Sequence, residues 1–249
     1  MFAKDGDQID IDLTRTQILL EVEDSLHSKR SDRRRKMTTN RMKIQRLTLM
    51  AFFCAIELIM GFTPIGYIPL GALSITTMHL PVLISGMLMG PKFGAGVGFV
   101  FGLTSFIRAM MQPGPTSFVF NPFVEVAGIH GNFFSILICF VPRILLGWLS
   151  GLMYCKIKKK ENHTLYASII SVVNTLIHTA LVLGGIYIFF AKDYAQALSM
   201  DVSMVGVLLM SVVTSNAILE AILAGGAVPV VLRALNPIAE RMGLDGKKS

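Results

Sequence analysis

Residues 63–102 read TPIGYIPLGALSITTMHLPVLISGMLMGPKFGAGVGFVFG, and this stretch decides the fold. Its first nine residues, Thr63–Gly71, hold two prolines and two glycines and predict a loop. The apolar run Leu73–Gly90 predicts a membrane helix, Gly90-Pro91-Lys92 predicts a tight turn, and Phe93–Met111 predicts a second helix that begins with several glycines. Because glycine lets helix backbones approach closely, we expect these two helices to pack tightly in a membrane.

The composition of the whole chain is typical of an integral membrane protein. Of its 249 residues 53% are hydrophobic and 16% are charged, and the mean hydropathy is +0.60. A single soluble domain is less apolar than this. Residues 1–36 carry as many acidic as basic side chains, so the net charge of +7 comes from the remainder. In a membrane protein such an excess is typical of cytoplasmic loops, and we expect no nucleic-acid partner.

The expected fold class is an all-α integral membrane protein with a bundle of six transmembrane helices over residues 41–235. Residues 1–40 are expected to form a polar cytoplasmic tail that is disordered or partly helical, unless translation starts at Met37 or Met42. Residues 236–249 are expected to form a second cytoplasmic tail. About 20 apolar residues cross a bilayer, and the four further spans are predicted at Leu47–Gly61, Asn132–Tyr154, Leu165–Phe190 and Val202–Leu232.

Basic residues predict the orientation of the bundle in the cell membrane. They precede the first span, occupy the turn at Lys92, follow the fourth span at 156–160 and follow the last span at Arg233. The positive-inside rule therefore places both the N- and the C-terminus in the cytoplasm. The segment Gln112–Gly131 holds no Lys or Arg and is expected outside, where its length predicts a lid or a site wall built with three aromatic residues, Phe118, Phe120 and Phe123.

Arg143 is the sharpest candidate for a binding residue. It lies about ten residues into the fourth span, near the middle of the membrane, where an arginine costs at least ~2.5–3.5 kcal/mol. Such a residue needs a partner. The partner is either Glu220, which lies similarly deep in the last span, or an anionic group of a ligand, and the sequence leaves both alternatives open.

Three other polar residues lie at a comparable depth. Asn174 and His178 are one turn apart in the fifth span, and Asn216 lies one turn before Glu220 in the sixth. Hydrogen bonding between helices explains any one of them. Because successive spans carry polar groups at one level, the set favours a polar pocket that opens to the outside among the last three spans.

No motif in the chain predicts catalysis, a cofactor or a metal. The sequence holds no HExxH, GxSxG or P-loop pattern. His79, beside Thr76 and Thr77, is more typical of a satisfied hydrogen-bonding residue than of a ligand. The three cysteines have no CxxC spacing and predict neither a disulfide framework nor a metal site; they are Cys54, Cys139 and Cys155. Active transport would therefore draw its energy from a gradient or from another subunit.

A series of motifs, taken in order, resembles one family. Ala51 and Ala55 have a small-xxx-small spacing, and the other motifs are IPLG at Ile68–Gly71, HLPVLISGMLMGPKFG at His79–Gly94, TSFVFNPF at Thr116–Phe123, PRILLGWLSG at Pro142–Gly151 and NAILEAILA at Asn216–Ala224. Over about residues 41–235 the chain resembles the substrate-binding S components of energy-coupling-factor (ECF) vitamin transporters. Within that group it looks most like the pantothenate type.

The resemblance implies that the chain captures a vitamin from outside and works with a transmembrane coupling subunit and two ABC-type ATPase subunits. It also implies that Ala51 and Ala55 dock on the coupling subunit. Pantothenate carries a carboxylate, two hydroxyls and an amide. We expect Arg143 or His178 to meet the carboxylate, in a site that includes Glu220, and amide side chains to meet the other groups, namely Asn121, Asn174 and Asn216.

Three alternatives remain open at this point. The first is an S component for riboflavin, folate, a pyridoxine-like compound or a lipid precursor, although flat rings favour aromatic stacking partners that are few in the last three spans. An intramembrane enzyme would need His79, His178 and Glu220 to converge on one cavity. A membrane anchor or sensor would show a collapsed bundle with no outward cavity.

Overall fold

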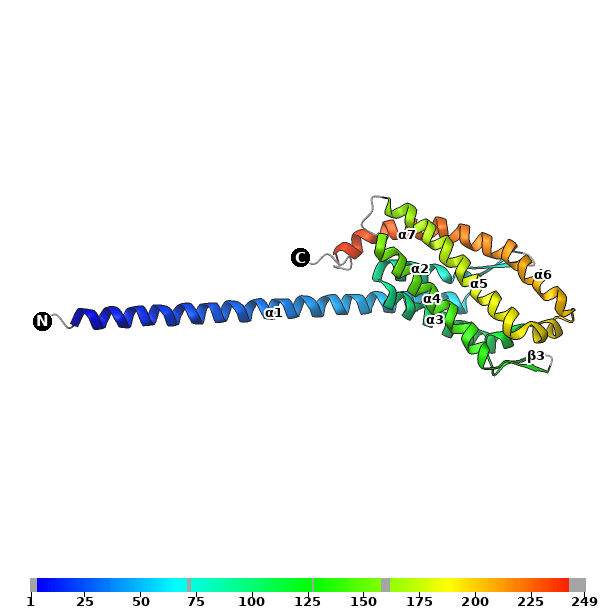
Figure 1. The fold of residues 1–249 in the computed structure, drawn as a ribbon, viewed down its shortest axis with the longest axis horizontal. Helices are drawn as coiled ribbons and strands as arrows, with labels where there is room; N and C mark the ends of the chain where they lie inside the picture. Colours follow the sequence, from blue (N-terminus) through cyan, green and yellow to red (C-terminus); the bar gives the residue numbers. More distant parts are fainter. Residues whose placement is uncertain (1–3, 71–72, 127, 158–161, 242–249) are drawn as a thin grey trace. The chain divides into compact units, whose positions relative to one another are not determined.

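A computed structural model of the chain describes residues 4–70, 73–126, 128–157 and 162–241 (Figure 1). The chain divides into two compact units, Met1–Gln45 and Arg46–Ser249. Helix α1 (Lys4–Phe62) provides the described part of the first unit and continues into the second. The chain is therefore helical from Lys4, where a disordered or partly helical tail was expected over 1–40, because no glycine or proline interrupts it between Gly6 and Gly61.

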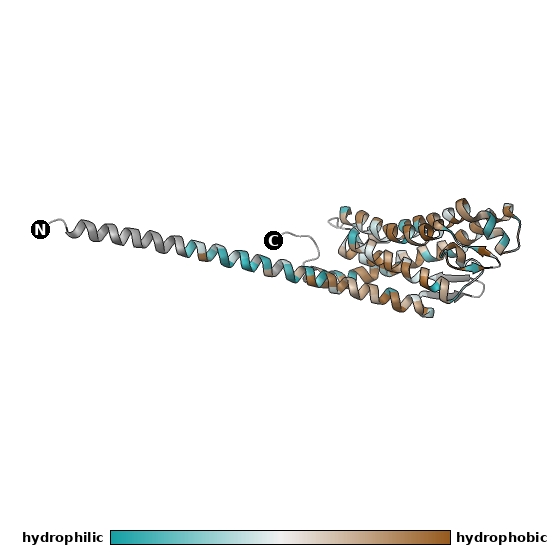
Figure 2. Ribbon diagram, turned by 90° about the horizontal axis from the view of Figure 1, so that it is seen from below, coloured by the Kyte–Doolittle hydropathy of each residue, from teal (hydrophilic) through white to brown (hydrophobic). Residues whose placement is uncertain are grey.

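The second unit consists mainly of apolar helices, as the sequence predicts (Figure 2). Among the described residues, five helical stretches are long and apolar enough to cross a membrane. The first is the apolar part of α1. The others are α3 (Pro91–Met111), α4 (Phe133–Ile157), α5 (His163–Ala197) and a last stretch in which α6 (Val202–Val212) continues through a π-helical turn (Val213–Ala217) into α7 (Ile218–Arg241).

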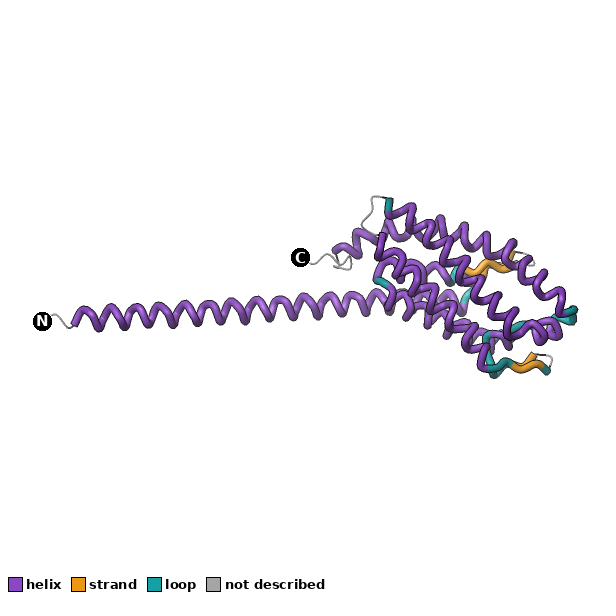
Figure 3. Tube along the Cα trace, viewed as in Figure 1, coloured by secondary structure: helices purple, strands orange, loops and turns teal. Residues whose placement is uncertain are grey.

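The helix predicted at Leu73–Gly90 begins later than expected. Tyr67–Leu70 and Leu73–Thr76 form the antiparallel strands β1 and β2, and α2 covers only His79–Met89 (Figure 3). Apolar and polar residues alternate along β2, which is the period of a strand. The 11 residues of α2 span about 16 Å, less than the ~30 Å of a bilayer core. Instead of crossing a membrane alone, α2 is buried against α3, α4 and α7.

Short elements complete the two long connections. A 3-10 turn (Pro64–Gly66) leads into β1, and a second one (Ser117–Val119) lies in the segment between α3 and α4. In that segment β3 (Glu125–Val126) and β4 (Ile129–His130) form a second small hairpin. The start of α6 is capped by Asp201, whose carboxylate accepts hydrogen bonds from the hydroxyl and the N–H of Ser203. These bonds lower the pKa of the Asp201 carboxyl.

Glycines bring the backbones of α2, α3 and α4 into direct contact. A Cβ atom added to Gly94 would meet the carbonyl oxygen of Gly147 and would lie 2.6 Å from the Cα atom of Gly86. A Cβ atom on Gly98 would meet the carbonyl oxygen of Arg143. This is the close packing that the glycine-rich sequence predicts. It also means that α3 supports the main chain of α4 at the position of Arg143.

The predicted tail at 236–249 is helical as far as the structure describes it. Helix α7 continues through Arg241, and residues 242–249 lie outside the described residues. Pro237 lies about one turn before the end of α7, and the helix continues past it. The basic segment predicted to mark the loop after the fourth span also lies largely outside the described residues, at 158–161.

Replacing Gly98 with alanine should destabilise the protein, since the new methyl group has only rigid backbone beside it. We expect Gly98→Ala to cost about 1–3 kcal/mol of unfolding free energy, measured by thermal denaturation of the purified protein in detergent. The matched control is Gly226→Ala, because nothing lies within 4 Å of the added Cβ there. Equal denaturation temperatures for the two variants would contradict this account of the α3–α4 contact.

Candidate ligand-binding site

A cavity of about 340 Å³ lies between β2, α3, α4, α5 and the region where α6 passes into α7. The volume is near the lower end of the ~300–1,000 Å³ that small-molecule sites usually have. Two arginines, a histidine and a carboxylate face a space that is otherwise mostly apolar. The polar residues that line it include Thr76, Ser105, Arg108, Arg143, His178, Asn216 and Glu220.

The position of Arg143 follows from the proline that precedes it. Pro142 has no N–H, so the carbonyl of Ile138, four residues earlier, loses its normal helical donor. The Nη1 atom of Arg143 donates a hydrogen bond of 2.6 Å to that carbonyl oxygen. The side chain is 6% exposed and lines the cavity. The dipeptide Pro142-Arg143 thus holds a guanidinium at the wall of the cavity by local chemistry.

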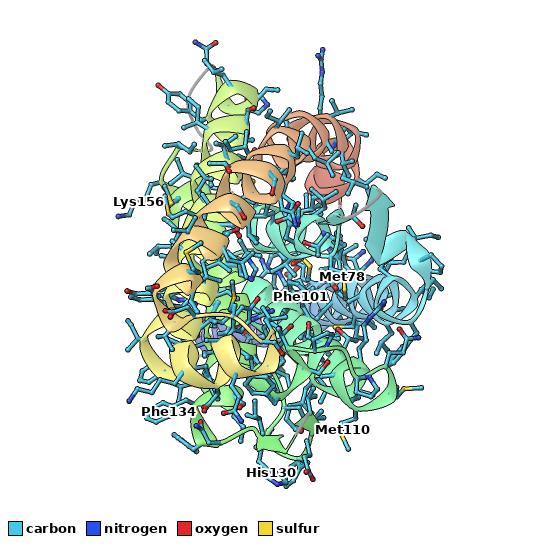
Figure 4. The ribbon with its side chains drawn as sticks, turned by 90° about the vertical axis from the view of Figure 1, so that its right-hand side faces the viewer. Met78, Phe101, Met110, His130, Phe134 and Lys156 are labelled. Atoms are coloured by element: carbon cyan, nitrogen blue, oxygen red, sulfur yellow. The ribbon has the colours of Figure 1, made fainter. Side chains whose placement is uncertain are left out.

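Two phenylalanines pack on the guanidinium of Arg143. Its Cζ atom lies 5.5 Å from the ring centroid of Phe101 and 5.2 Å from that of Phe120. Cation–π contacts at such distances are favourable when they are removed from water. Figure 4 shows Phe101 inside the bundle among the helices. Since Phe120 lies in the segment between α3 and α4, that segment provides part of the cavity wall, in agreement with the role expected for Gln112–Gly131.

The other two phenylalanines of this segment have different positions. Phe118 is fully buried and packs edge-on against Phe190 of α5, with ring centroids 5.9 Å apart. Phe123 is 77% exposed. Only Phe120 of the three therefore lines the cavity among the described contacts. Phe118 anchors the segment, and Phe120 is held over Arg143 as a consequence.

Glu220 lines the same cavity as Arg143, but its described hydrogen bonds join it to β2. Its Oε1 atom accepts from the N–H of Thr76 at 2.8 Å and from the hydroxyl of Thr76 at 2.6 Å. These bonds attach the β1–β2 hairpin to α7.

Three buried polar atoms on the cavity wall have no hydrogen-bond partner within the described part of the chain. They are the hydroxyl oxygen of Ser105, the Nε2 atom of His178 and the amide oxygen of Asn216. Burying such a group without a partner costs about 1–3 kcal/mol. Water or a polar ligand in the cavity would remove that cost, so the three atoms, which come from three different helical stretches, define a surface prepared for hydrogen bonding.

Asn216 owes its position to a π-helical turn. The turn Val213–Ala217 interrupts the hydrogen-bond pattern between α6 and α7. The hydroxyl of Thr214 donates to the carbonyls of Met210 and Ser211, and the hydroxyl of Ser215 donates to Ser211. Such side-chain bonds to the preceding turn compete with the helical pattern. π-helical turns often occur at functional sites, and here the turn carries Asn216 to the cavity.

Asn121 and Asn174 do not line the cavity. Asn121 is fully buried; its Nδ2 atom donates to the carbonyl of Phe106, and its Oδ1 atom accepts from the N–H of Phe123. The Nδ2 atom of Asn174 donates to the carbonyl of Ile170 and contacts the sulfur of Met153 at 3.4 Å. Both side chains connect elements of the fold, and we do not include them in the site.

Ala51 and Ala55 are exposed on α1 within the second unit, four residues apart. Their small side chains leave room for another helix to approach. The face that α1 turns inward is different, because Glu57 and Phe53 are buried there. The exposed pair is therefore available for the docking role that was expected of it.

Residues of α3 were missed by the sequence analysis. Phe101, Ser105 and Arg108 all line the cavity, although the pocket was expected among the last three spans. The Nη1 atom of Arg108 also donates to the carbonyl of Gly61 near the end of α1, at 3.0 Å. The signal that was available is their spacing, since residues three to four apart share one face of a helix.

His79 lies close to this site but not on its wall. It is 2% exposed and starts α2, immediately after Met78. Both ring nitrogens lack a hydrogen-bond partner within the described residues. It is absent from the residues that line the cavity. The enzyme alternative requires His79, His178 and Glu220 to converge on one cavity, and this cavity is lined by His178 and Glu220 without His79.

Comparison with known proteins gives one family. The family model described as "ECF transporter, substrate-specific component" matches residues 45–232. The chain is similar to the pantothenic acid transporter PanT of Lactococcus lactis subsp. cremoris, with 37% identity over 166 residues that cover 65% of this chain and 79% of the relative. It is also similar to the pantothenate transporter PanT of Leuconostoc mesenteroides subsp. mesenteroides, with 30% identity over 220 residues, 84% of this chain and 100% of the relative.

Among solved structures, the chain is similar to the S-component for biotin from an ECF-type ABC transporter. The sequence identity is 17% and the TM-score is 0.43, over 78% of this chain and 92% of that chain.

The attachment of β2 to α7 through Glu220 can be tested by hydrogen exchange. In Glu220→Ala the N–H of Thr76 loses its acceptor, and since a hydrogen bond contributes ~1 kcal/mol, we expect its amide to exchange about fivefold faster or more. Glu220→Gln keeps an oxygen acceptor and serves as the matched control. Unchanged exchange at Thr76 in Glu220→Ala would show that Glu220 does not hold the hairpin.

Proposed function

This chain belongs to the family of substrate-specific (S) components of ECF transporters, and we propose that its cavity binds pantothenate for import. The observation that carries the proposal is a guanidinium held at the wall of a small cavity together with three unpartnered polar atoms. As a member of the family the chain is an integral membrane protein and a component of a transporter, not an enzyme, which confirms the resemblance found in the sequence.

The chemistry of pantothenate matches this cavity group by group. Its carboxylate suits the guanidinium of Arg143, because a charge-assisted hydrogen bond to arginine is strongest where water is excluded. Its hydroxyls and amide both donate and accept. They suit the hydroxyl of Ser105, the Nε2 atom of His178 and the amide oxygen of Asn216, whose partners are missing among the described residues. The two relatives named as pantothenate transporters support the same ligand.

The aromatic residues of the cavity favour a flexible ligand over riboflavin or folate. Phe101 and Phe120 are the rings on the wall, and both already contact the guanidinium of Arg143. A flat ring system needs free aromatic faces on which to stack. The small volume of the cavity supports the same choice, since a ligand with several fused or linked rings would need more space.

As an S component the chain has a vitamin as its substrate and an ECF module as its partner. We propose that this module consists of a transmembrane coupling subunit and two ABC-type ATPase subunits, and that Ala51 and Ala55 dock on the coupling subunit. Their exposure on α1 supports this role. The basic residues around the bundle support N- and C-termini in the cytoplasm and a cavity that opens outward.

The proposal is tested by equilibrium binding of radiolabelled pantothenate to the purified chain alone, with riboflavin and folate as competitors. We expect saturable binding that an excess of unlabelled pantothenate removes and that the other two vitamins leave unchanged, because the cavity offers a cation and hydrogen bonds but no free aromatic face. Binding of riboflavin or folate in place of pantothenate would overturn the choice of ligand. A folded preparation that binds no vitamin would overturn the site as well.

Removing the charge at position 143 should weaken pantothenate binding. We expect Arg143→Gln to raise Kd at least about 30-fold, since the loss of one partner from a buried charge pair costs ~2 kcal/mol or more. Glutamine removes the charge and keeps a neutral N–H donor in the side chain. Arg233→Ala, which removes an exposed arginine outside the cavity, is the control and should leave Kd unchanged. A normal Kd for Arg143→Gln would rule out contact with the carboxylate.

Ser105 should recognise one hydroxyl of the ligand. We expect Ser105→Ala to raise the Kd for pantothenate by about three- to tenfold, because a hydrogen bond contributes ~0.5–1.5 kcal/mol. The same substitution should leave unchanged the Kd for the pantothenate analogue that lacks the contacted hydroxyl. Ser211→Ala, at an exposed position outside the cavity, is the matched control. If Ser105→Ala weakens pantothenate and every deoxy analogue equally, Ser105 does not contact a hydroxyl.

A further inference from the structure

A strongly basic segment of α1 lies almost wholly outside the region that the family model matches. Residues 29–46 hold nine Lys and Arg but a single acidic residue, Asp32. The family match begins at residue 45. Figure 2 shows the described part of α1 before the apolar span as hydrophilic. Neither the cavity nor the proposed coupling face uses this segment, so its charge needs a separate explanation.

Basic residues outnumber acidic ones nine to one in the segment, and most of those whose surroundings the structure describes are exposed. Five of them are exposed over two turns of α1, namely Lys29, Arg30, Arg33, Arg34 and Lys36. Nearer the membrane span, Arg41 and Lys43 are exposed as well. Asp32 is the single carboxylate among them. A helix with this charge density attracts polyanions, and its affinity for them depends on salt.

The apolar span that follows the basic segment indicates which polyanion the segment binds. Arg46 is followed directly by Leu47, where the apolar part of α1 begins, and that part is long and apolar enough to cross a membrane. Basic residues next to a membrane span lie within reach of lipid headgroups, and each contributes ~1 kcal/mol near an anionic surface. A nucleic acid would have to compete with that surface. We propose that residues 29–46 bind the anionic phospholipid headgroups of the leaflet into which α1 inserts.

The length of the segment predicts how it binds. At ~1.5 Å per residue, Lys29 lies about 26 Å along the helix from Arg46. The Debye length at physiological salt is ~8 Å, so on a helix perpendicular to the membrane only the residues near Arg46 would sense the lipid charge. The residues Lys29–Lys36 can contribute only if the segment lies along the surface.

The test uses the full chain in nanodiscs, with a donor dye at Ser31→Cys and acceptor-labelled lipid in the disc. The three native cysteines are replaced by serine so that only position 31 is labelled. In discs that contain phosphatidylglycerol we expect efficient energy transfer, which falls at about 1 M NaCl, where the Debye length is ~3 Å. In phosphatidylcholine discs, and in a variant with Lys29, Arg30, Arg33, Arg34 and Lys36 changed to Gln, we expect low transfer. Glu23→Gln with Asp24→Asn is the matched control and should retain it.

Two results would overturn the proposal. One is energy transfer that is the same in both lipids and insensitive to salt, because headgroup charge would then have no role. The other is a dye remote from the bilayer in every disc, combined with binding of a labelled RNA oligonucleotide in the presence of phosphatidylglycerol. That result would identify the segment as a nucleic-acid site. The residues substituted in α1 before the apolar span are exposed, and elution of the cysteine-free protein and of each variant as a single species establishes that the comparison is between folded proteins. The test does not depend on the vitamin, so it can fail while the proposed function stands.

Discussion

A hydrogen bond that a proline removes from α4 determines where one of the two positive charges of the cavity lies. Without the N–H of Pro142, the carbonyl of Ile138 needs another donor in a medium that offers little water. Arg143 supplies that donor from the next position in the chain. Its guanidinium is thereby kept near the helix instead of extending toward the membrane surface, as long basic side chains in membranes usually do.

The neighbours of Arg143 hold this arrangement from two sides. On the main-chain side, Gly98 of α3 touches the Arg143 carbonyl, and no larger residue would fit there. On the side-chain side, Phe101 and Phe120 cover the guanidinium. Pro229 in α7 likewise leaves the carbonyl four residues earlier without its helical donor. That carbonyl, of Gly225, accepts a hydrogen bond from the hydroxyl of Ser168 in α5. In that second case the donor comes from another helix, so the bond ties α5 to α7 and adds no charge.

The remaining polar residues form two groups. One group makes its hydrogen bonds within the chain, and the other has polar atoms without a hydrogen bond among the described residues. Glu220 and Asn121 have their hydrogen bonds within the chain, and each joins a connecting segment to a helix. Ser105, His178 and Asn216 line the cavity with atoms that have none among the described residues. A low-dielectric site raises the cost of each such atom. A ligand with several donors and acceptors would recover that cost at all three positions, which fits the proposed binding of pantothenate.

The sequence predicted five helical stretches that are long and apolar enough to cross a membrane, because hydropathy reports which segments lie at membrane depth. It did not predict which residues face the cavity, since depth says nothing about rotation about a helix axis. For that reason Asn174 was expected at the site and Ser105 was not. The strand β2 was read as helix because its residues are apolar, although their alternation is the period of a strand. The Oδ1 atom of Asn121 accepts a hydrogen bond from the N–H of Phe123, two residues ahead. Asparagine often forms this bond in turns, so the sequence could have indicated a structural role for Asn121.

The central claim is that Arg143 receives the carboxylate of the vitamin inside the cavity between α3, α4, α5 and the π-helical turn. A structure of the chain determined with bound pantothenate would test it most directly. The account predicts ligand density in this cavity, with the carboxylate within hydrogen-bond distance of the Arg143 guanidinium and the hydroxyl end toward Ser105, His178 and Asn216. Density with the carboxylate on Arg108, or a ligand outside this cavity, would contradict it.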